Sequence, residues 1–183
     1  MEGIREQDEV YVNHSGEVVK FVGYGTVIAF IVAWLMHAIR DAIGGSFLID
    51  GIFPNNESIW NHMKLAFYPS LIVTLVPWCE YVKRIEFKKR CVMATIAAFM
   101  SQFIVAMGYY GLRFGFNIEG MITNFVLLFV ALLFGFIHAA MISDDHIYQW
   151  VRWLGVAYVV GMVGLYYIFA AVTPALPIFT ALD

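Results

Sequence analysis

Five stretches of the chain are each about twenty residues long and carry no charged side chain near their middle. They run over residues 21–43, 64–82, 92–112, 121–142 and 151–173. The hydrocarbon core of a bilayer is about 30 Å thick, and a helix needs roughly 20 apolar residues to cross it. Hydrophobic residues make up 61% of the 183 positions, which is more than a soluble domain of this size can bury. The sequence therefore predicts a multi-pass protein of the cell membrane.

The same stretches predict the fold class. In lipid, every backbone polar group needs a partner within the protein, which leaves helices and closed barrels. The stretches lack the alternation of apolar and polar residues that barrel strands show. We therefore expect an all-α integral membrane bundle of five transmembrane helices, forming a single transmembrane domain over residues 1–183. Gly44 and Gly45 are expected to end the first helix, whereas Pro69 and Pro77 are expected to bend the second.

Basic residues predict how the helices are oriented. Cytoplasmic loops of membrane proteins carry an excess of Lys and Arg. The connection between the second and third predicted helices, residues 83–90, holds five of the 11 basic residues. If the five helices alternate, only Arg40, Lys64 and Arg113 fall on the opposite side. We expect the N-terminus inside with residues 1–20 as a polar cytoplasmic segment, the C-terminus outside, and a bacterial or archaeal inner membrane. A net charge of −3 speaks against nucleic acid as a partner.

Polar residues gather on the predicted outer side. His37 and Asp41 are four residues apart at the end of the first helix, so they share a face. Asp41 lies near a helix C-terminus, where the helix dipole disfavours a carboxylate. It should therefore have a compensating partner, such as Arg40, Arg113, His37 or a bound cation. The alternative is an interfacial cluster of ion pairs in which Arg40 points to water.

A second polar stretch, NESIWNHMK at residues 56–64, precedes the second helix. Glu57 and His62 are five residues apart, so on a regular helix they point apart. They could converge if the helix begins after Glu57 or if a ligand comes from another helix. A purely structural interpretation makes Asn56 a helix cap and Trp60 a headgroup anchor. The candidate ligand-binding residues on this side are His37, Asp41, Glu57, His62 and Arg113.

The 56–64 stretch, followed by Phe67-Tyr68-Pro69, resembles the signature of a family of small bacterial multi-pass membrane proteins of unknown function. The pattern of that family reads N-E-S-V-W-E-H-x-K. This chain has Ile59 in place of the valine and Asn61 in place of the second glutamate. The ending, with Pro174, Pro177, Phe179 and Asp183, is similar to that of the family but shorter. The resemblance implies a five-helix fold and no known activity.

Two features concern helix packing. Ser101 and Gln102 are a strongly polar pair in the middle of the third helix, where they are expected to make interhelical hydrogen bonds or to line a polar pathway. Gly161 and Gly164 give the fifth helix a small-residue face for close packing within the chain, with a second copy, or with a partner subunit.

Three function classes remain open. The favoured one is binding or transport of an ion or small polar solute through the outward-facing polar cluster. The first alternative is a structural or accessory subunit of a membrane complex. The second is a small intramembrane metal-dependent enzyme, in which a divalent metal would use Glu57, His62 and Asp41. No cofactor is predicted, and the enzyme is the least favoured class because the spacing of these residues is not a zinc-site spacing.

Overall fold

The computed structural model describes residues 2–142 and 148–179, with side chains described for residues 15–40, 42–142 and 148–179. The described residues form helices and no strand. In chain order the elements are α1 (Glu2–Ile43), α2 (Phe47–Ile52), α3 (Ile59–Leu75), α4 (Glu80–Arg84), α5 (Phe87–Tyr110), the π-helical turn η1 (Gly111–Gly115), α6 (Met121–Met141) and α7 (Gln149–Ala171).

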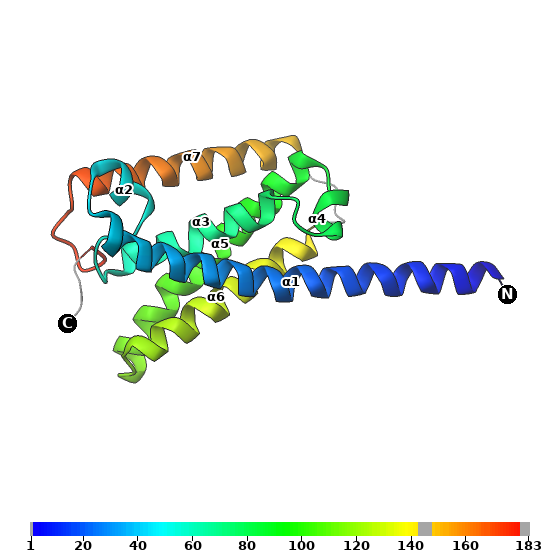
Figure 1. Ribbon diagram of the computed structural model, residues 1–183, viewed down its shortest axis with the longest axis horizontal. Coiled ribbons are helices and arrows are strands. Elements are labelled where there is room, and N and C mark those ends of the chain that lie inside the picture. Colours follow the sequence, from blue (N-terminus) through cyan, green and yellow to red (C-terminus); the bar gives the residue numbers. More distant parts are fainter. Residues whose placement is uncertain (1, 143–147, 180–183) are drawn as a thin grey trace.

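The long helices run between the two ends of an elongated bundle (Figure 1). One end carries the N-terminus and α4, and we call it the basic end because the loop cations of residues 83–90 lie there. The other, the distal end, carries α2, η1 and the segment that follows α7. Helices α3 and α6 pack against α5, α1 packs across α3 and α6, and α7 packs on α5 and α2.

Within the part of the chain that the structure describes, four helical segments are long and apolar enough to cross a membrane: Ser15–Arg40, Phe87–Gly115, Met121–Met141 and Gln149–Ala171. Large apolar side chains also cover the outside of the bundle, where half or more of each is exposed; examples are Ile31, Trp34, Phe103, Val126 and Leu154. An apolar exterior of this extent is unfavourable in water and suits a hydrocarbon surrounding. These two features fit the predicted multi-pass helical membrane bundle.

Helix α3 differs from the predicted second transmembrane helix. It has 17 residues and begins at Ile59, not near residue 64, so it is shorter than the roughly 20 residues that cross a bilayer. Pro69 lies within it as predicted, but Pro77 lies beyond its end at Leu75. A proline disfavours the helical conformation of the residue before it, and Val76 is extended with φ −75° and ψ 127°. The expectation that Pro77 bends a helix was therefore wrong.

The other predicted helices differ from the structure mainly at their ends. Helix α1 begins at Glu2, so the predicted polar N-terminal segment is helical and continuous with the first span. Helix α5 begins at Phe87, within the stretch that was expected to be a loop. Gly44 follows α1 with a φ of +74°, a conformation that glycine adopts without steric cost. That ending confirms the predicted stop.

Helix α2, which was not predicted, is fixed to the rest of the bundle by polar contacts. Lys64 of α3 is 1% exposed, and its Nζ donates to the backbone oxygen of Asp50 over 2.6 Å. The Tyr68 hydroxyl donates to the backbone oxygen of Gly51 over 2.9 Å. Arg40 Nε donates to Asp50 Oδ1 over 3.1 Å, so Arg40 does not simply point to water. These contacts hold α2 against α1 and α3.

Ser101 and Gln102 join helices, as the sequence predicts. The Gln102 amide group donates to the hydroxyl of Tyr166, and its carbonyl oxygen accepts from the hydroxyl of Tyr158. Both tyrosines belong to α7. Ser70 of α3 donates to the Ser101 hydroxyl over 3.4 Å. Because lipid offers no hydrogen bonds, buried polar groups need partners within the protein, and these bonds connect α5 to α3 and α7.

Candidate functional site

A cavity of about 670 Å³ lies at the distal end between α1, α3, α5 and α6. We call it the distal cavity. Its polar lining consists of His37, Glu57, His62, Tyr109, Arg113, Glu119, Thr123 and Asn124. Apolar residues complete the walls, among them Trp34, Leu65, Met121, Phe125 and Leu128. The space therefore combines charged groups with hydrophobic surface, which is typical of small-molecule sites.

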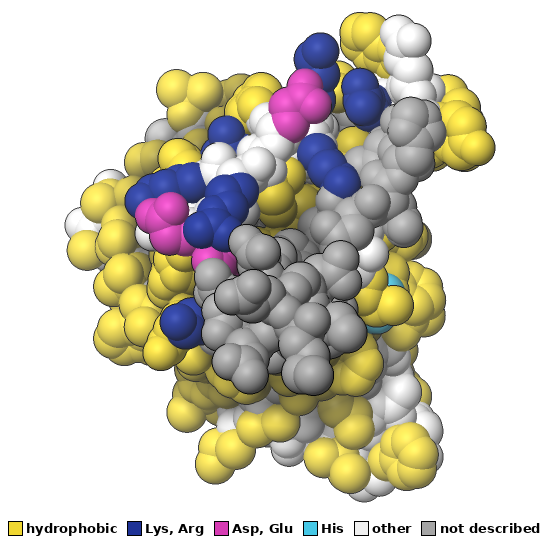
Figure 2. Space-filling view, turned by 90° about the vertical axis from the view of Figure 1, so that its right-hand side faces the viewer, with side chains coloured by type: hydrophobic (Ala, Val, Ile, Leu, Met, Phe, Trp, Pro, Cys, Tyr) yellow, Lys and Arg dark blue, Asp and Glu magenta, His cyan; other side chains and the backbone are white. Residues whose placement is uncertain are grey.

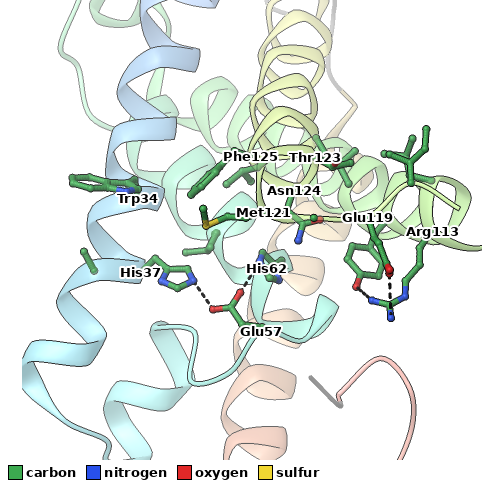
Figure 3. Close-up of a pocket in the computed structure, with 18 residues that line it drawn as sticks. Trp34, His37, Glu57, His62, Arg113, Glu119, Met121, Thr123, Asn124 and Phe125 are labelled. Atoms are coloured by element: carbon green, nitrogen blue, oxygen red, sulfur yellow. Dashed lines mark hydrogen bonds and ion pairs between the residues drawn. The ribbon is translucent and has the colours of Figure 1, made fainter. Parts of the chain in front are cut away.

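Glu57 lies between two histidines that come from different helices (Figure 3). Its Oε1 is 3.0 Å from Nε2 of His37 on α1, and its Oε2 is 3.5 Å from Nε2 of His62 on α3. The sequence predicts that Glu57 and His62 converge only if the second helix begins after Glu57. Helix α3 does begin after it, at Ile59. Glu57 therefore lies in the loop before the helix, and its carboxylate contacts both imidazoles.

The local structure before α3 places the Glu57 carboxylate. Ser58 is the N-cap, and its hydroxyl accepts from the backbone N–H of Asn61 over 3.4 Å. Asn56 lies in the loop before this cap, and its Oδ1 accepts from the backbone N–H of Ser58 over 3.0 Å. The predicted cap at Asn56 was therefore wrong by two residues. Trp60 is 8% exposed and packs against Tyr166, so it is a core residue and not a headgroup anchor.

Asn61 stabilises the same turn through its amide N–H groups. Asn61 Nδ2 donates to Asn55 Oδ1 over 2.8 Å and to the Ser58 hydroxyl over 3.0 Å. An ionised carboxylate cannot donate hydrogen bonds. An asparagine at this position therefore supports the loop that carries Glu57 in a way that a glutamate could not.

One hydrogen bond assigns the protonation of His62. Its Nδ1–H donates to the backbone oxygen of Ser58 over 2.9 Å, so in the neutral ring Nε2 carries the lone pair. That lone pair faces Glu57 Oε2 at 3.5 Å, which sets two hydrogen-bond acceptors against each other. An ammonium or another group with two N–H bonds, placed beside these two atoms, could donate to both. With His62 neutral, the pair is therefore suited to accept hydrogen bonds from a bound molecule.

A second polar group lines another part of the distal cavity (Figure 3). Arg113 Nη1 donates to the Tyr109 hydroxyl over 3.1 Å, one helical turn away. Arg113 Nη2 is 3.4 Å from Glu119 Oε2. The guanidinium therefore faces the same space as the His37–Glu57–His62 group but pairs with different residues.

Comparison with known proteins places the chain in a family. The profile of a family of unknown function, DUF6512, matches residues 11–182. The chain belongs to this family. No curated protein and no solved structure matches it. The expectation that the chain belongs to a family of unknown function is thus confirmed, and the match spans every residue that lines the distal cavity.

In this DUF6512 chain, the structure brings together three of the five predicted ligand-binding residues, His37, Glu57 and His62. Arg113 lines the same cavity, and it pairs there with Tyr109 and Glu119. The side chain of Asp41 lies outside the described residues. Among the described residues, no group of three or more His, Cys, Asp or Glu side chains could hold a metal ion.

Four polar lining residues, Tyr109, Glu119, Thr123 and Asn124, were not among the predicted ligand-binding residues. Tyr109 precedes Arg113 by four residues, and that spacing puts both on one helix face. This spacing could have singled out Tyr109 from the sequence. Glu119 and Asn124 flank the turn into α6, where Gly120 has a φ of +131°. The direction of these two side chains depends on the backbone conformation of that turn, which the sequence pattern does not predict.

Proposed function

We propose that this DUF6512 protein is a membrane protein that binds a small polar organic solute in the distal cavity. The observation that carries the proposal is the Glu57 carboxylate, held between His37 and His62 at the wall of a cavity of about 670 Å³. Ligand sites commonly have volumes of about 300–1,000 Å³ with mixed apolar and polar walls. The Glu57 side chain is 61% exposed, so an incoming molecule can reach it.

The charges indicate the kind of solute. Glu57 Oε2 and His62 Nε2 form a pair of acceptors, which favours a ligand that brings a donor, such as a primary amine or a hydroxyl. Arg113 lines another part of the cavity, where its guanidinium pairs with the Glu119 carboxylate, so that part of the wall carries charges of both signs. Trp34, Met121 and Phe125 give the space apolar walls. An organic amine fits this set of groups better than a bare metal ion.

Binding is proposed here in preference to passage through the bundle. Ser101 and Gln102, the polar pair that could line a pathway, have hydrogen-bond partners on α3 and α7. They therefore serve helix packing. We also propose that α3 crosses the bilayer together with the four longer helices, because it runs between the same two ends of the bundle (Figure 1). The distal cavity would then face the exterior and the basic end the cytoplasm.

Binding measurements on the purified protein test the proposal. The probes are a panel of primary amines, from ethylamine to histamine, with alcohols and carboxylates of the same size for comparison. Thermal stabilisation identifies the probes that bind, because a ligand specific to the folded state raises the free energy of unfolding. We expect amines to stabilise the protein more than the matched carboxylates do.

The decisive variant is Glu57→Gln, which keeps the shape of the side chain and removes its charge. A hydrogen bond to a charged group contributes about 1.5–3 kcal/mol, so amine affinity should fall about 10- to 150-fold. Glu86→Gln is the matched control, because Glu86 is similarly exposed, at 67%, but lies at the basic end. If Glu57→Gln binds the amines as tightly as the unchanged protein and the control, the assignment of the site is wrong.

An accessory role through α7 is the second candidate function. An added Cβ at Gly161 or Gly164 would meet no atom within 4 Å, so these glycines do not serve packing among the described residues. Val160 and Leu154 on the same helix are 66% and 63% exposed. Small residues let helix backbones approach closely in lipid, which supports a partner helix on this face.

A further inference from the structure

A second cavity, of about 490 Å³, lies at the basic end between α3, α5 and α7. We call it the basic-end cavity. Lys88 of α5 and Arg152 of α7 belong to its lining, and Leu71, Val92, Val156 and Val160 are among its apolar walls. It shares no lining residue with the distal cavity. Nothing in the proposed solute binding depends on it.

The basic-end cavity is polar where the helices begin and apolar farther in. Its lining on α5 runs from Phe87 to Thr95, and its lining on α7 runs from Gln149 to Val160. At a rise of 1.5 Å per residue, these runs reach about 12 Å and about 16 Å from the starts of the two helices. The charged residues Lys88 and Arg152 lie in the first turns, and valines dominate the far part. An amphiphile with one charged end matches this arrangement.

The charge at the mouth is positive. The Lys88 side chain is 68% exposed and forms an ion pair with Glu86, with 3.9 Å between Nζ and Oε1. This separation is too long for a hydrogen bond, and an exposed pair of this kind is weak. Arg152 Nε is shielded from solvent, and none of the described residues supplies it with a hydrogen-bond partner. Helices α5 and α7 both begin here without a side-chain cap, so their N-terminal dipoles add further positive potential. An anionic group would satisfy these donors.

Aromatic residues place this mouth at the membrane surface. Trp150 and Trp153 of α7 are 66% and 65% exposed, and they flank Arg152 in the sequence. Exposed tryptophans of membrane proteins concentrate at the headgroup level. Lys and Arg side chains also gather on this end of the molecule (Figure 2). The cations of the cavity mouth therefore lie where phospholipid headgroups would be.

We propose that the basic-end cavity binds an anionic phospholipid. Its phosphate lies between Lys88 and Arg152, and one acyl chain occupies the apolar slot between α5 and α7. Basic pockets between transmembrane helices are suited to anionic headgroups because the charge and the hydrocarbon are recognised together. The lipid also fills the space that remains at the basic end between α7 and the adjoining parts of α3 and α5.

Native mass spectrometry of the detergent-solubilised full chain tests this site, with phosphatidylglycerol and phosphatidylcholine of identical acyl chains as probes. We expect phosphatidylglycerol to bind more tightly. Lys88→Gln and Arg152→Gln should each weaken its binding about fivefold, and the double variant about 25-fold, because a basic residue near an anionic membrane surface contributes about 1 kcal/mol. Lys88→Arg keeps the positive charge and should retain the binding. It serves as the control for folding, because it also changes the side chain at this position.

Lys83→Gln is the matched control. Lys83 belongs to the same basic loop but does not line the cavity, and its Nζ donates to Glu80 Oε1 over 2.7 Å. This contact holds the pKa of Glu80 below its usual range, so Lys83 is already paired. Its replacement should change phosphatidylglycerol binding by less than twofold. An effect as large as that of Lys88→Gln would mean diffuse surface attraction and would overturn the site.

A final pair of measurements tests the acyl chain. Val156→Phe places a larger side chain on the cavity wall at a position that is 48% exposed and leaves both cations unchanged, so it should weaken phosphatidylglycerol binding more than tenfold. Glycerol 3-phosphate, which has the phosphate but no acyl chain, should compete poorly. Strong competition by glycerol 3-phosphate would show a site for soluble phosphates, and equal binding of the two phospholipids would show no selection for charge. Either result would refute the proposal.

Discussion

The contact between α5 and α6 makes the sharpest stability prediction, at Gly135. A Cβ added there would lie 2.6 Å from the backbone oxygen of Ala97 and would also overlap the Ser101 hydroxyl. The hydroxyl can rotate away, but the backbone oxygen moves only with helix α5. Gly135→Ala should therefore force the two helices apart. Gly25→Ala is the matched control, because its Cβ would meet the nearest atoms, on Phe136 and Val73, at an ordinary 3.6 Å.

The expected magnitude follows from comparing the two variants. Both place alanine inside a helix, where it is about 1 kcal/mol more favourable than glycine, so this gain cancels in the comparison. Relieving a contact of 2.6 Å requires the helices to separate by several tenths of an ångström. A gap of about 0.5–1 Å already loses a quarter to a half of the attraction between packed atoms, and overpacking costs typically about 1–3 kcal/mol. Gly135→Ala should be less stable than Gly25→Ala by about that amount.

Unfolding by SDS titration in mixed micelles, followed by tryptophan fluorescence, measures this difference. The unchanged protein, Gly25→Ala and Gly135→Ala are compared in the same detergent, and circular dichroism confirms that all three remain helical before titration. We expect Gly25→Ala to equal or exceed the stability of the unchanged protein and Gly135→Ala to unfold at a lower fraction of SDS. Equal midpoints for the two variants would refute the close approach of α5 and α6.

Three further predictions concern other parts of the bundle. Gln102→Leu should lower the free energy of unfolding by about 1–3 kcal/mol for each tyrosine hydroxyl left unpaired; adding Tyr158→Phe and Tyr166→Phe should recover most of this loss in the same titration. Reporter fusions at the two termini should report opposite sides of the membrane, and a result on the same side would contradict the proposal that α3 crosses it. Gly161→Leu should leave unfolding of the monomer unchanged but reduce cross-linking to a partner or second copy. Unchanged cross-linking would count against the α7 interface.

The long apolar helices could be predicted because a bilayer imposes a minimum length on each run. The second predicted helix was misplaced because Lys64 looks like the charged end of an apolar run. In the structure Lys64 is buried, and its ammonium group finds a backbone oxygen on α2. The hydropathy pattern does not predict this contact. Helix α2 has only six residues, which is too short for a recognisable helical period in the sequence. The true start of α3 depends on the cap at Ser58, a local feature that the apolar pattern does not reveal.

The candidate site was predictable in composition but not in geometry. Polar residues next to apolar helices indicated where a site would lie, and His37, Glu57 and His62 were chosen for that reason. Whether Glu57 meets His62 depends on a difference of a few residues in the start of α3. Whether it meets His37 depends on how α1 packs against α3, which a single sequence does not encode in any local pattern. The contact between Arg113 and Tyr109 could have been predicted more readily, because the two residues are four apart along the continuous run of α5 and η1.

The burial of α3 has a consequence for how the chain enters the membrane. Most of this helix is covered by its neighbours, and it carries buried polar groups such as Asn61, Lys64 and Thr74. A segment with this content gains little from contact with acyl chains and does not insert well by itself. Its stable position requires α5 and α6, which are synthesised after it. If α3 crosses the bilayer as proposed, biogenesis of the bundle is therefore expected to be completed late, when the hairpin of α5 and α6 arrives and encloses α3.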